Sequence, residues 1–84
     1  MNRETLIEQI NQVMIEGFEL EPSQLQPQAQ IIEDLELDSL DAIDMLVFLE
    51  EKIKIKVDAE TFRTVKTLDD VYNVVENVVK ESDN

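Results

Sequence analysis

The sequence contains no cysteine, no histidine and no tryptophan, and only one glycine and two prolines. Without cysteine the chain can form neither a disulfide nor a thiolate metal site, so nothing indicates an oxidising compartment. Without histidine it cannot build a Ser-His-Asp triad, a Cys-His pair or an HExxH zinc helix. These absences exclude most of the common hydrolytic and metal-dependent enzyme sites.

Long apolar runs are also missing. The longest covers residues 45–49, whereas a membrane-spanning helix needs about 20 apolar residues. Residues 1–6 are polar and acidic where a signal peptide would have its apolar stretch. We therefore expect one cytoplasmic domain over residues 1–84, with an ordered core over residues 3–80, a frayed C-terminal tail and no membrane insertion.

Positive charge is scarce, because 7 Lys and Arg stand against 20 Asp and Glu and leave a net charge of −13. Such a chain is repelled by nucleic acid and by anionic membranes. A partner should therefore present basic patches. The apolar fraction of 43% is nevertheless high enough for a folded core.

A first helix is predicted from Thr5 to Ile15. Its apolar residues share one helix face; they are Leu6, Ile10, Val13 and Met14. Asn2 competes with the Thr5–Glu8 capping-box pattern as its start. Gly17, the only glycine, is expected to end this helix in the left-handed conformation.

Three further helices are predicted. One begins after Asp38 and covers residues 39–52, and a short one follows Asp58 over residues 59–63 with Phe62 turned inward. Thr67, with Asp70 in the capping-box place, starts the last helix. Residues 53–57 alternate like a strand but have no matching partner strand, so we expect an extended connector.

Residues 18–38 show no sustained periodicity and contain both prolines. Several apolar residues are spread through this segment; they are Phe18, Leu20, Leu25, Ile31, Ile32, Leu35 and Leu37. A connection of this length in a small domain is usually functional or disordered. We expect an ordered loop held to the core by these side chains. We also expect it to cross the length of the molecule, so that the helices on either side are roughly parallel or obliquely packed. The predicted fold is an all-α small bundle of three main helices plus one short helix.

The helix over residues 39–52 has two apolar faces at 100° per residue. One is a core face; it comprises Ala42, Met45, Leu46, Leu49 and Ile53. Leu40, Ile43 and Val47 form a second stripe, flanked by Asp44, Glu50 and Glu51. Exposed apolar residues rimmed by charge are typical of binding surfaces.

Eight acidic residues and no basic one lie between Glu33 and Glu51. They form either a solvated face or a binding surface, and the interleaved apolar stripe favours the second. Asp34, Glu36 and Asp38 have the spacing of an EF-hand, but Ser39 and Met45 stand where that loop needs Gly and Glu. We therefore expect no defined metal site, only diffuse attraction of divalent cations.

Ser39 follows Asp38 at the start of this helix, where outward-pointing N–H groups favour a phosphate. As a nucleophile Ser39 has no base: histidine is absent, and Ala42 stands where an SxxK motif needs lysine. Ser39 is therefore either part of a helix cap or a residue that another enzyme modifies.

Residues 33–46, EDLELDSLDAIDML, closely resemble the attachment motif of acyl carrier proteins of the discrete type II kind. The likeness extends over about residues 3–80, through the long loop, the Leu49-Glu50-Glu51 helix end, the short helix after Asp58 and the Thr67 start of the last helix. The resemblance implies that a phosphopantetheinyl transferase moves 4′-phosphopantetheine from coenzyme A onto Ser39. The thiol of that arm then carries an acyl group as a thioester, for which the helical core could part.

The resemblance also implies that the helix after Ser39 is recognised by acyl-transferring and condensing enzymes with basic docking patches. The carboxylates expected to meet their Arg and Lys are Asp38, Asp41, Asp44, Glu50 and Glu51, and the apolar contact residues are Leu40, Ile43 and Val47. We expect a monomer that performs no catalysis and serves fatty-acid, polyketide or polyene-type synthesis.

Two alternatives remain open. One is an aminoacyl, D-alanyl or peptidyl carrier, although the Gly-Gly-x-Ser type of motif is absent. The other is an acidic helical adaptor that carries nothing. Within the resemblance one position departs: many family members have Gly where Glu36 stands, which puts the shape of the loop before Ser39 in question.

Overall fold

The computed structural model describes residues 2–82, and for Ser39 and Ser82 the backbone alone. Within this range the elements are α1 (Arg3–Phe18), the 3₁₀ turn η1 (Pro22–Gln24), α2 (Ser39–Ile53), α3 (Ala59–Phe62) and α4 (Leu68–Ser82). Residues 2–82 contain no β-strand. Their backbone forms one isolated β-bridge, between Gln30 and Thr67. The predicted all-α fold of three main helices and one short helix is confirmed.

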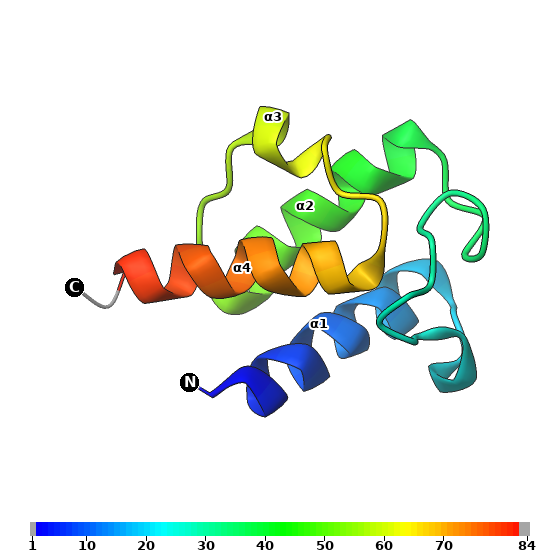
Figure 1. The fold of residues 1–84 in the computed structure, drawn as a ribbon, viewed down its shortest axis with the longest axis horizontal. Helices are drawn as coiled ribbons and strands as arrows, with labels where there is room; N and C mark the ends of the chain where they lie inside the picture. The colour runs from blue at the N-terminus through cyan, green and yellow to red at the C-terminus, as the bar shows by residue number, and fades with distance from the viewer. Residues whose placement is uncertain (1, 83–84) are drawn as a thin grey trace.

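The helix α1 packs against both α2 and α4, and α3 contacts α2 and α4 on the side away from α1. In Figure 1, α1 runs from left to right, whereas α2 and α4 run back from right to left. The loop between α1 and α2 stays at the right-hand end of the molecule. The expectation that the loop crosses the length of the molecule is therefore wrong, and of the two packing arrangements expected for the flanking helices, the roughly parallel one is wrong because α1 and α2 run in opposite directions.

The loop is ordered by both burial and hydrogen bonds. Its buried apolar residues are Leu20, Leu25, Ala29, Ile31, Leu35 and Leu37. The Ile31 amide donates to the Lys66 carbonyl at 2.9 Å, and the Leu68 amide donates to the Ala29 carbonyl at 3.0 Å. The prediction of a loop held to the core is confirmed, except that Ile32 is 65% exposed. Ile32 points outward because its neighbour Ile31 takes the inward place.

The ends of α1 differ from the prediction. Asn2 is the N-cap, since its side chain accepts the Thr5 amide at 2.8 Å. At the other end the left-handed residue is Glu19, with φ of 56°, and Gly17 lies inside the helix. The assignment of Gly17 as the left-handed residue is therefore wrong. A Cβ added at Gly17 would lie 2.9 Å from Cδ2 of Phe48, so a larger residue there would crowd the close contact between α1 and α2.

The remaining boundaries are close to those expected. Residues 55–58 form the extended connector, with Ile55 and Val57 buried. Phe62 is buried on the inner side of α3, as predicted. The helix α4 continues to Ser82, two residues beyond the expected fraying point, and residues 83–84 lie outside the described residues. Val78 and Val79 pack against the core and hold this last turn.

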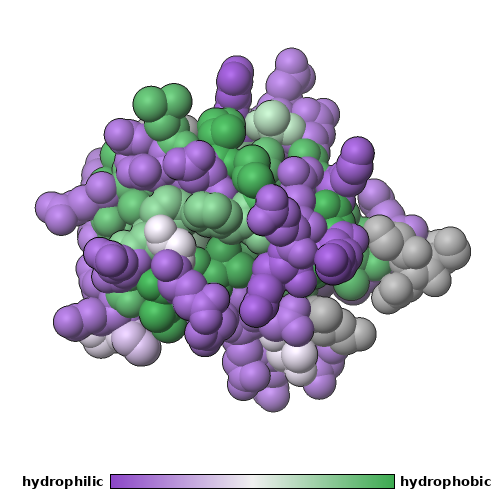
Figure 2. Space-filling view, turned by 180° about the vertical axis from the view of Figure 1, so that it is seen from behind, coloured by the Kyte–Doolittle hydropathy of each residue, from purple (hydrophilic) through white to green (hydrophobic). Residues whose placement is uncertain are grey.

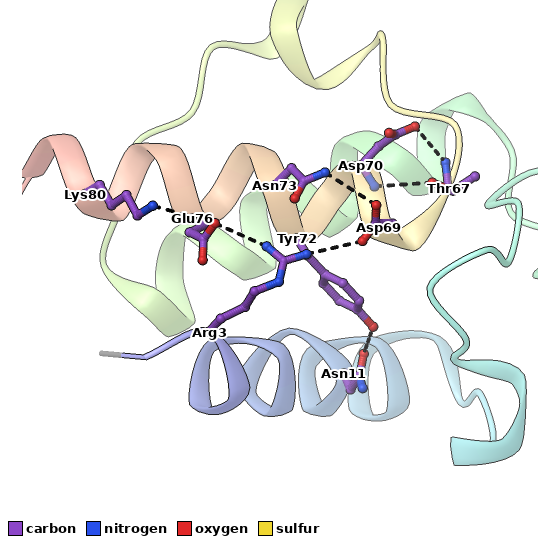
Figure 3. A network of polar contacts seen from close by, with 9 residues as sticks. All are labelled: Arg3, Asn11, Thr67, Asp69, Asp70, Tyr72, Asn73, Glu76 and Lys80. Atoms are coloured by element: carbon purple, nitrogen blue, oxygen red, sulfur yellow. Dashed lines mark hydrogen bonds and ion pairs between the residues drawn. The ribbon is translucent and has the colours of Figure 1, made fainter.

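A polar network joins α1 to α4 (Figure 3). The Arg3 guanidinium lies 3.2 Å from carboxylate oxygens of both Asp69 and Glu76. The Tyr72 hydroxyl donates to Oδ1 of Asn11 at 2.6 Å, and burial raises the pKa of that hydroxyl. These contacts let a phenol and a guanidinium sit between the helices without leaving a buried polar atom unpaired among the described side chains.

The N-terminus of α4 is closed by a reciprocal cap, as predicted. The Thr67 and Lys66 amides donate to Oδ2 of Asp70 at 3.2 and 3.0 Å, and the Asp70 amide donates to the Thr67 hydroxyl at 3.2 Å. The hydrogen bonds from the Lys66 and Thr67 amides lower the pKa of Asp70 below its ordinary value of 3.8. The ionised carboxylate is therefore the form that stabilises this helix start.

We predict that Asp70→Asn lowers the free energy of unfolding by about 1 kcal/mol near pH 7, a typical value for a helix cap. Because the folded pKa of Asp70 is depressed, its stabilising contribution is complete above the unfolded value and is lost as the pH falls through the folded pKa. Urea unfolding at several pH values should therefore show the gap between the two proteins closing in acid.

Glu8→Gln, an exposed change on α1, is the control for the loss of one negative charge. Its difference from the unmodified protein should not follow the acid limb of Asp70. A gap between Asp70→Asn and the unmodified protein that stays constant down to strong acid would contradict the capping role.

Candidate functional site

The start of α2 is held by a reciprocal cap between two carboxylates. The Asp41 amide donates to Oδ1 of Asp38 at 2.9 Å, and the Asp38 amide donates to Oδ2 of Asp41 at 3.1 Å. Ser39 is the first residue of the helix. Its side chain lies outside the described part of the structure, but its neighbours Asp38 and Leu40 are both exposed.

The chain reaches this cap through a left-handed residue. Glu36 has φ of 56°, a conformation that costs an ordinary residue about 1 kcal/mol and glycine almost nothing. The turn lets Leu35 and Leu37 on either side both be buried, with the Leu37 amide donating to the Ile31 carbonyl at 3.2 Å. The position where the resemblance leads one to expect glycine is thus one where glycine's conformational freedom matters.

The two faces predicted for α2 are both present. Met45, Leu46 and Leu49 are buried in the core. On the second stripe Leu40 is 74% exposed and Val47 is 43% exposed, while Ile43 is half-buried. Figure 2, which views the molecule from behind, shows apolar side chains among hydrophilic ones on the side where α2 lies.

The carboxylates predicted to meet partners have different local duties. Asp44 and Glu51 are exposed. Glu50 is half-buried, and its Oε2 accepts the Val57 amide at 2.9 Å, so it ties the connector to α2. Asp41 is half-buried and belongs to the helix cap. Asp44 and Glu51 are thus the most accessible of the four within α2, and Asp38, the N-cap, is exposed as well.

An open cavity of about 690 Å³ lies beside Leu40, the residue that follows Ser39. Its lining includes apolar residues from three segments, namely Ile31 and Ile32 of the loop, Ala42 and Ile43 of α2, and Phe62 of α3. Leu40 and Ile32, both strongly exposed, belong to the same lining. The start of α2 thus has an apolar recess next to it.

Two exposed apolar residues, Ile32 and Phe48, were not identified as such from the sequence. Ile32 was expected to be held to the core but is exposed, whereas Phe62 is turned inward as predicted and also contributes to the cavity lining. Phe48 was assigned to neither face of α2, yet it is 38% exposed and lies 5.8 Å from the Phe18 ring, centroid to centroid. On the helix Phe48 lies about 80° from Leu40, between the two apolar faces. This position could have indicated that its side chain is partly exposed.

Among the described residues no group of three or more acidic side chains is arranged to hold a metal ion. Likewise, no helix within residues 2–82 has the length and apolar character needed to cross a membrane.

Comparison with known proteins gives consistent matches over most of the chain. A family model described as "Phosphopantetheine attachment site" matches residues 6–75. The chain is 32% identical over 79 residues to "Acyl carrier protein 2" of Ralstonia nicotianae, covering 94% of this chain and 98% of that protein. It is 33% identical over 69 residues to the acyl carrier protein of Helicobacter hepaticus, covering 82% and 91% of the two chains. It is 29% identical over 79 residues to that of Thermosynechococcus vestitus, covering 94% and 98%.

We predict that Glu36→Gly raises the free energy of unfolding by about 0.5 kcal/mol, because the relief of the left-handed backbone slightly exceeds the entropy cost of glycine in the unfolded chain. Chemical denaturation measures the change. Glu36→Ala, which removes the charge but keeps Cβ, should not give this gain in full. Glu33→Gly, in the same loop but without positive φ, should destabilise the protein. Equal effects of the two glycine substitutions would refute the conformational explanation.

We further predict that millimolar magnesium or calcium raises the melting temperature, since the cations reduce repulsion within a chain of net charge −13. The two cations should act alike, and sodium chloride at the same ionic strength should act less. Differential scanning calorimetry tests this. Saturation at one equivalent, or a strong preference for calcium, would indicate a defined site instead.

Proposed function

The chain belongs to the acyl carrier protein family, and on that premise we propose that Ser39 is the residue to which 4′-phosphopantetheine is attached. The matched segment, residues 6–75, contains two serines, Ser23 and Ser39. Ser23 lies within the short 3₁₀ turn η1, whereas Ser39 begins α2. The observation that carries the proposal is this position of Ser39 at the capped start of a long helix.

The residues around Ser39 suit a phosphodiester attached there. A helix leaves the amides of its first turn without intrahelical acceptors, and they favour negative charge at that end. The Asp38–Asp41 cap holds the first turn in shape. The cavity bordered by Leu40 offers apolar surface directly beside the attachment point.

The proposed role is to carry cargo without catalysis by the chain itself. The arm supplies a thiol on which an acyl group is held as a thioester. The α2 helix presents the arm, and the recess between the loop, α2 and α3 is proposed to cover the apolar part of the acyl chain. We propose that the carrier works in the cytoplasm and serves fatty-acid, polyketide or polyene-type biosynthetic enzymes.

Docking is proposed to use the exposed side of α2. The carboxylates proposed to attract Arg and Lys of the transferase and of acyl-transferring and condensing enzymes are Asp38, Asp41, Asp44, Glu50 and Glu51. Asp44 and Glu51 are the most accessible of those within the helix, and Leu40 and Val47 provide exposed apolar contacts beside them. Surface charges of this kind raise the rate of association with a basic partner, and this effect weakens as the salt concentration rises. A small apolar contact keeps the affinity modest.

We predict that Ser39→Ala abolishes loading by a broad-specificity phosphopantetheinyl transferase supplied with coenzyme A. Intact mass spectrometry should show one added phosphopantetheine on the unmodified chain and none on the variant. Because Asp38 and Asp41 make the cap, the variant should keep its helical circular dichroism and its cooperative melting.

Ser23→Ala is the matched control, since it removes the other serine of the matched segment and should load normally. Loading of Ser39→Ala would place the attachment elsewhere. Failure of the unmodified chain to load would instead favour an acidic adaptor that carries nothing.

A further inference from the structure

A second, separate groove lies between α1 and α2. It has a volume of about 530 Å³ and is lined by Val13, Glu16 and Gly17 of α1 and by Phe48, Glu51 and Lys52 of α2. It shares no lining residue with the cavity beside Leu40. The groove therefore belongs to neither the attachment point nor the recess proposed for the acyl chain.

The floor of this groove is built by the close approach of the two helices. Val13 is buried, and Gly17 has no side chain to cover the ring of Phe48. The Phe48 ring is tilted by 57° against Phe18 and remains 38% exposed. The aromatic ring of Phe48 is thus partly exposed to solvent. A residue larger than glycine at position 17 would crowd this ring.

The rim of the groove is mainly acidic. Glu16 and Glu51 approach it from the two helices, and both are exposed. The Gln12 amide donates to Oε1 of Glu16 at 2.9 Å and so restricts that carboxylate. Lys52 is the basic residue of the lining, so the carboxylates still outnumber the cation.

We propose that this groove binds an arginine side chain of a basic partner protein. A guanidinium is flat, weakly hydrated and attracted to aromatic faces, and its planar set of donors matches carboxylates. Phe48 provides the aromatic surface, and Glu16 and Glu51 provide the carboxylates on either side. The partner's surface would then extend from α2 onto the end of α1.

The chemistry distinguishes arginine from lysine. An ammonium is compact and strongly hydrated, so it gains less from an exposed ring and cannot pair in a planar, two-pronged way. A general acidic surface would attract both cations equally. A preference for arginine is therefore the property that separates this groove from the remaining charge of the protein.

The test is a nuclear magnetic resonance titration of the full, ¹⁵N-labelled chain with N-acetyl-L-argininamide, and in parallel with N-acetyl-L-lysinamide, at constant ionic strength. The largest amide shifts should fall on residues 13–18 and 47–52. Arginine should bind about two- to five-fold more tightly than lysine, the range expected from an exposed cation–π contact. Equal binding of the two probes, or shifts spread over residues 33–44, would overturn the proposal.

Two variants and a control sharpen the result. Phe48→Leu keeps an apolar side chain and should remove the preference for arginine, whereas Glu16→Gln should weaken both probes. Glu60→Gln, an exposed change on α3, should alter neither. An unchanged arginine preference in Phe48→Leu would refute the role of the ring.

The inference depends on the proposed carrier function only in assigning the arginine to a partner enzyme. The transferase assay on Ser39 keeps the two apart. Loading of Ser39 without localised arginine binding would overturn the groove and leave the carrier function intact. Localised arginine binding by a chain that cannot be loaded would do the opposite.

Discussion

The burial of apolar side chains in the loop between α1 and α2 is the constraint on which the rest of the structure depends. Leu35 and Leu37 insert into the core on either side of Glu36, whose left-handed backbone makes this possible. The hydrogen bonds from Ile31 to Lys66 and from Leu68 to Ala29 tie the same loop to the start of α4. Because the loop is held in this way, α2 begins at a defined place, and the proposed attachment point and its recess follow from it.

The strong negative charge is distributed between structure and surface. Asp70 and the Asp38–Asp41 pair close helix starts, where a carboxylate is favoured by free amides and by the helix dipole. Glu50 holds the amide of Val57. Asp44 and Glu51 remain accessible. A partner that approaches α2 would therefore meet fewer freely available carboxylates than composition alone suggests.

Sequence patterns predicted the structure well wherever the local geometry depends on residues that are close together in the chain. The Thr67–Asp70 cap, the inward Phe62 and the extended connector were all predicted, since each depends on neighbours within a few residues. Gly17 was assigned to a left-handed helix end because glycine commonly stands there. It instead allows Phe48 of another helix to approach, a contact between residues far apart in the sequence.

The sequence by itself determined the helices and the acidic surface of α2, because caps, periodicity and charge are local properties of the chain. The candidate attachment serine came from the resemblance of residues 33–46 to the motif of acyl carrier proteins. Only the tertiary structure decided that α1 and α2 run in opposite directions. It also decided that Ile32 and Leu40 border one recess and that Phe48 lines a groove beside Gly17. The direction of packing depends on how a long loop buries its side chains. Cavities and grooves arise between segments whose separation along the chain says nothing of their distance in space.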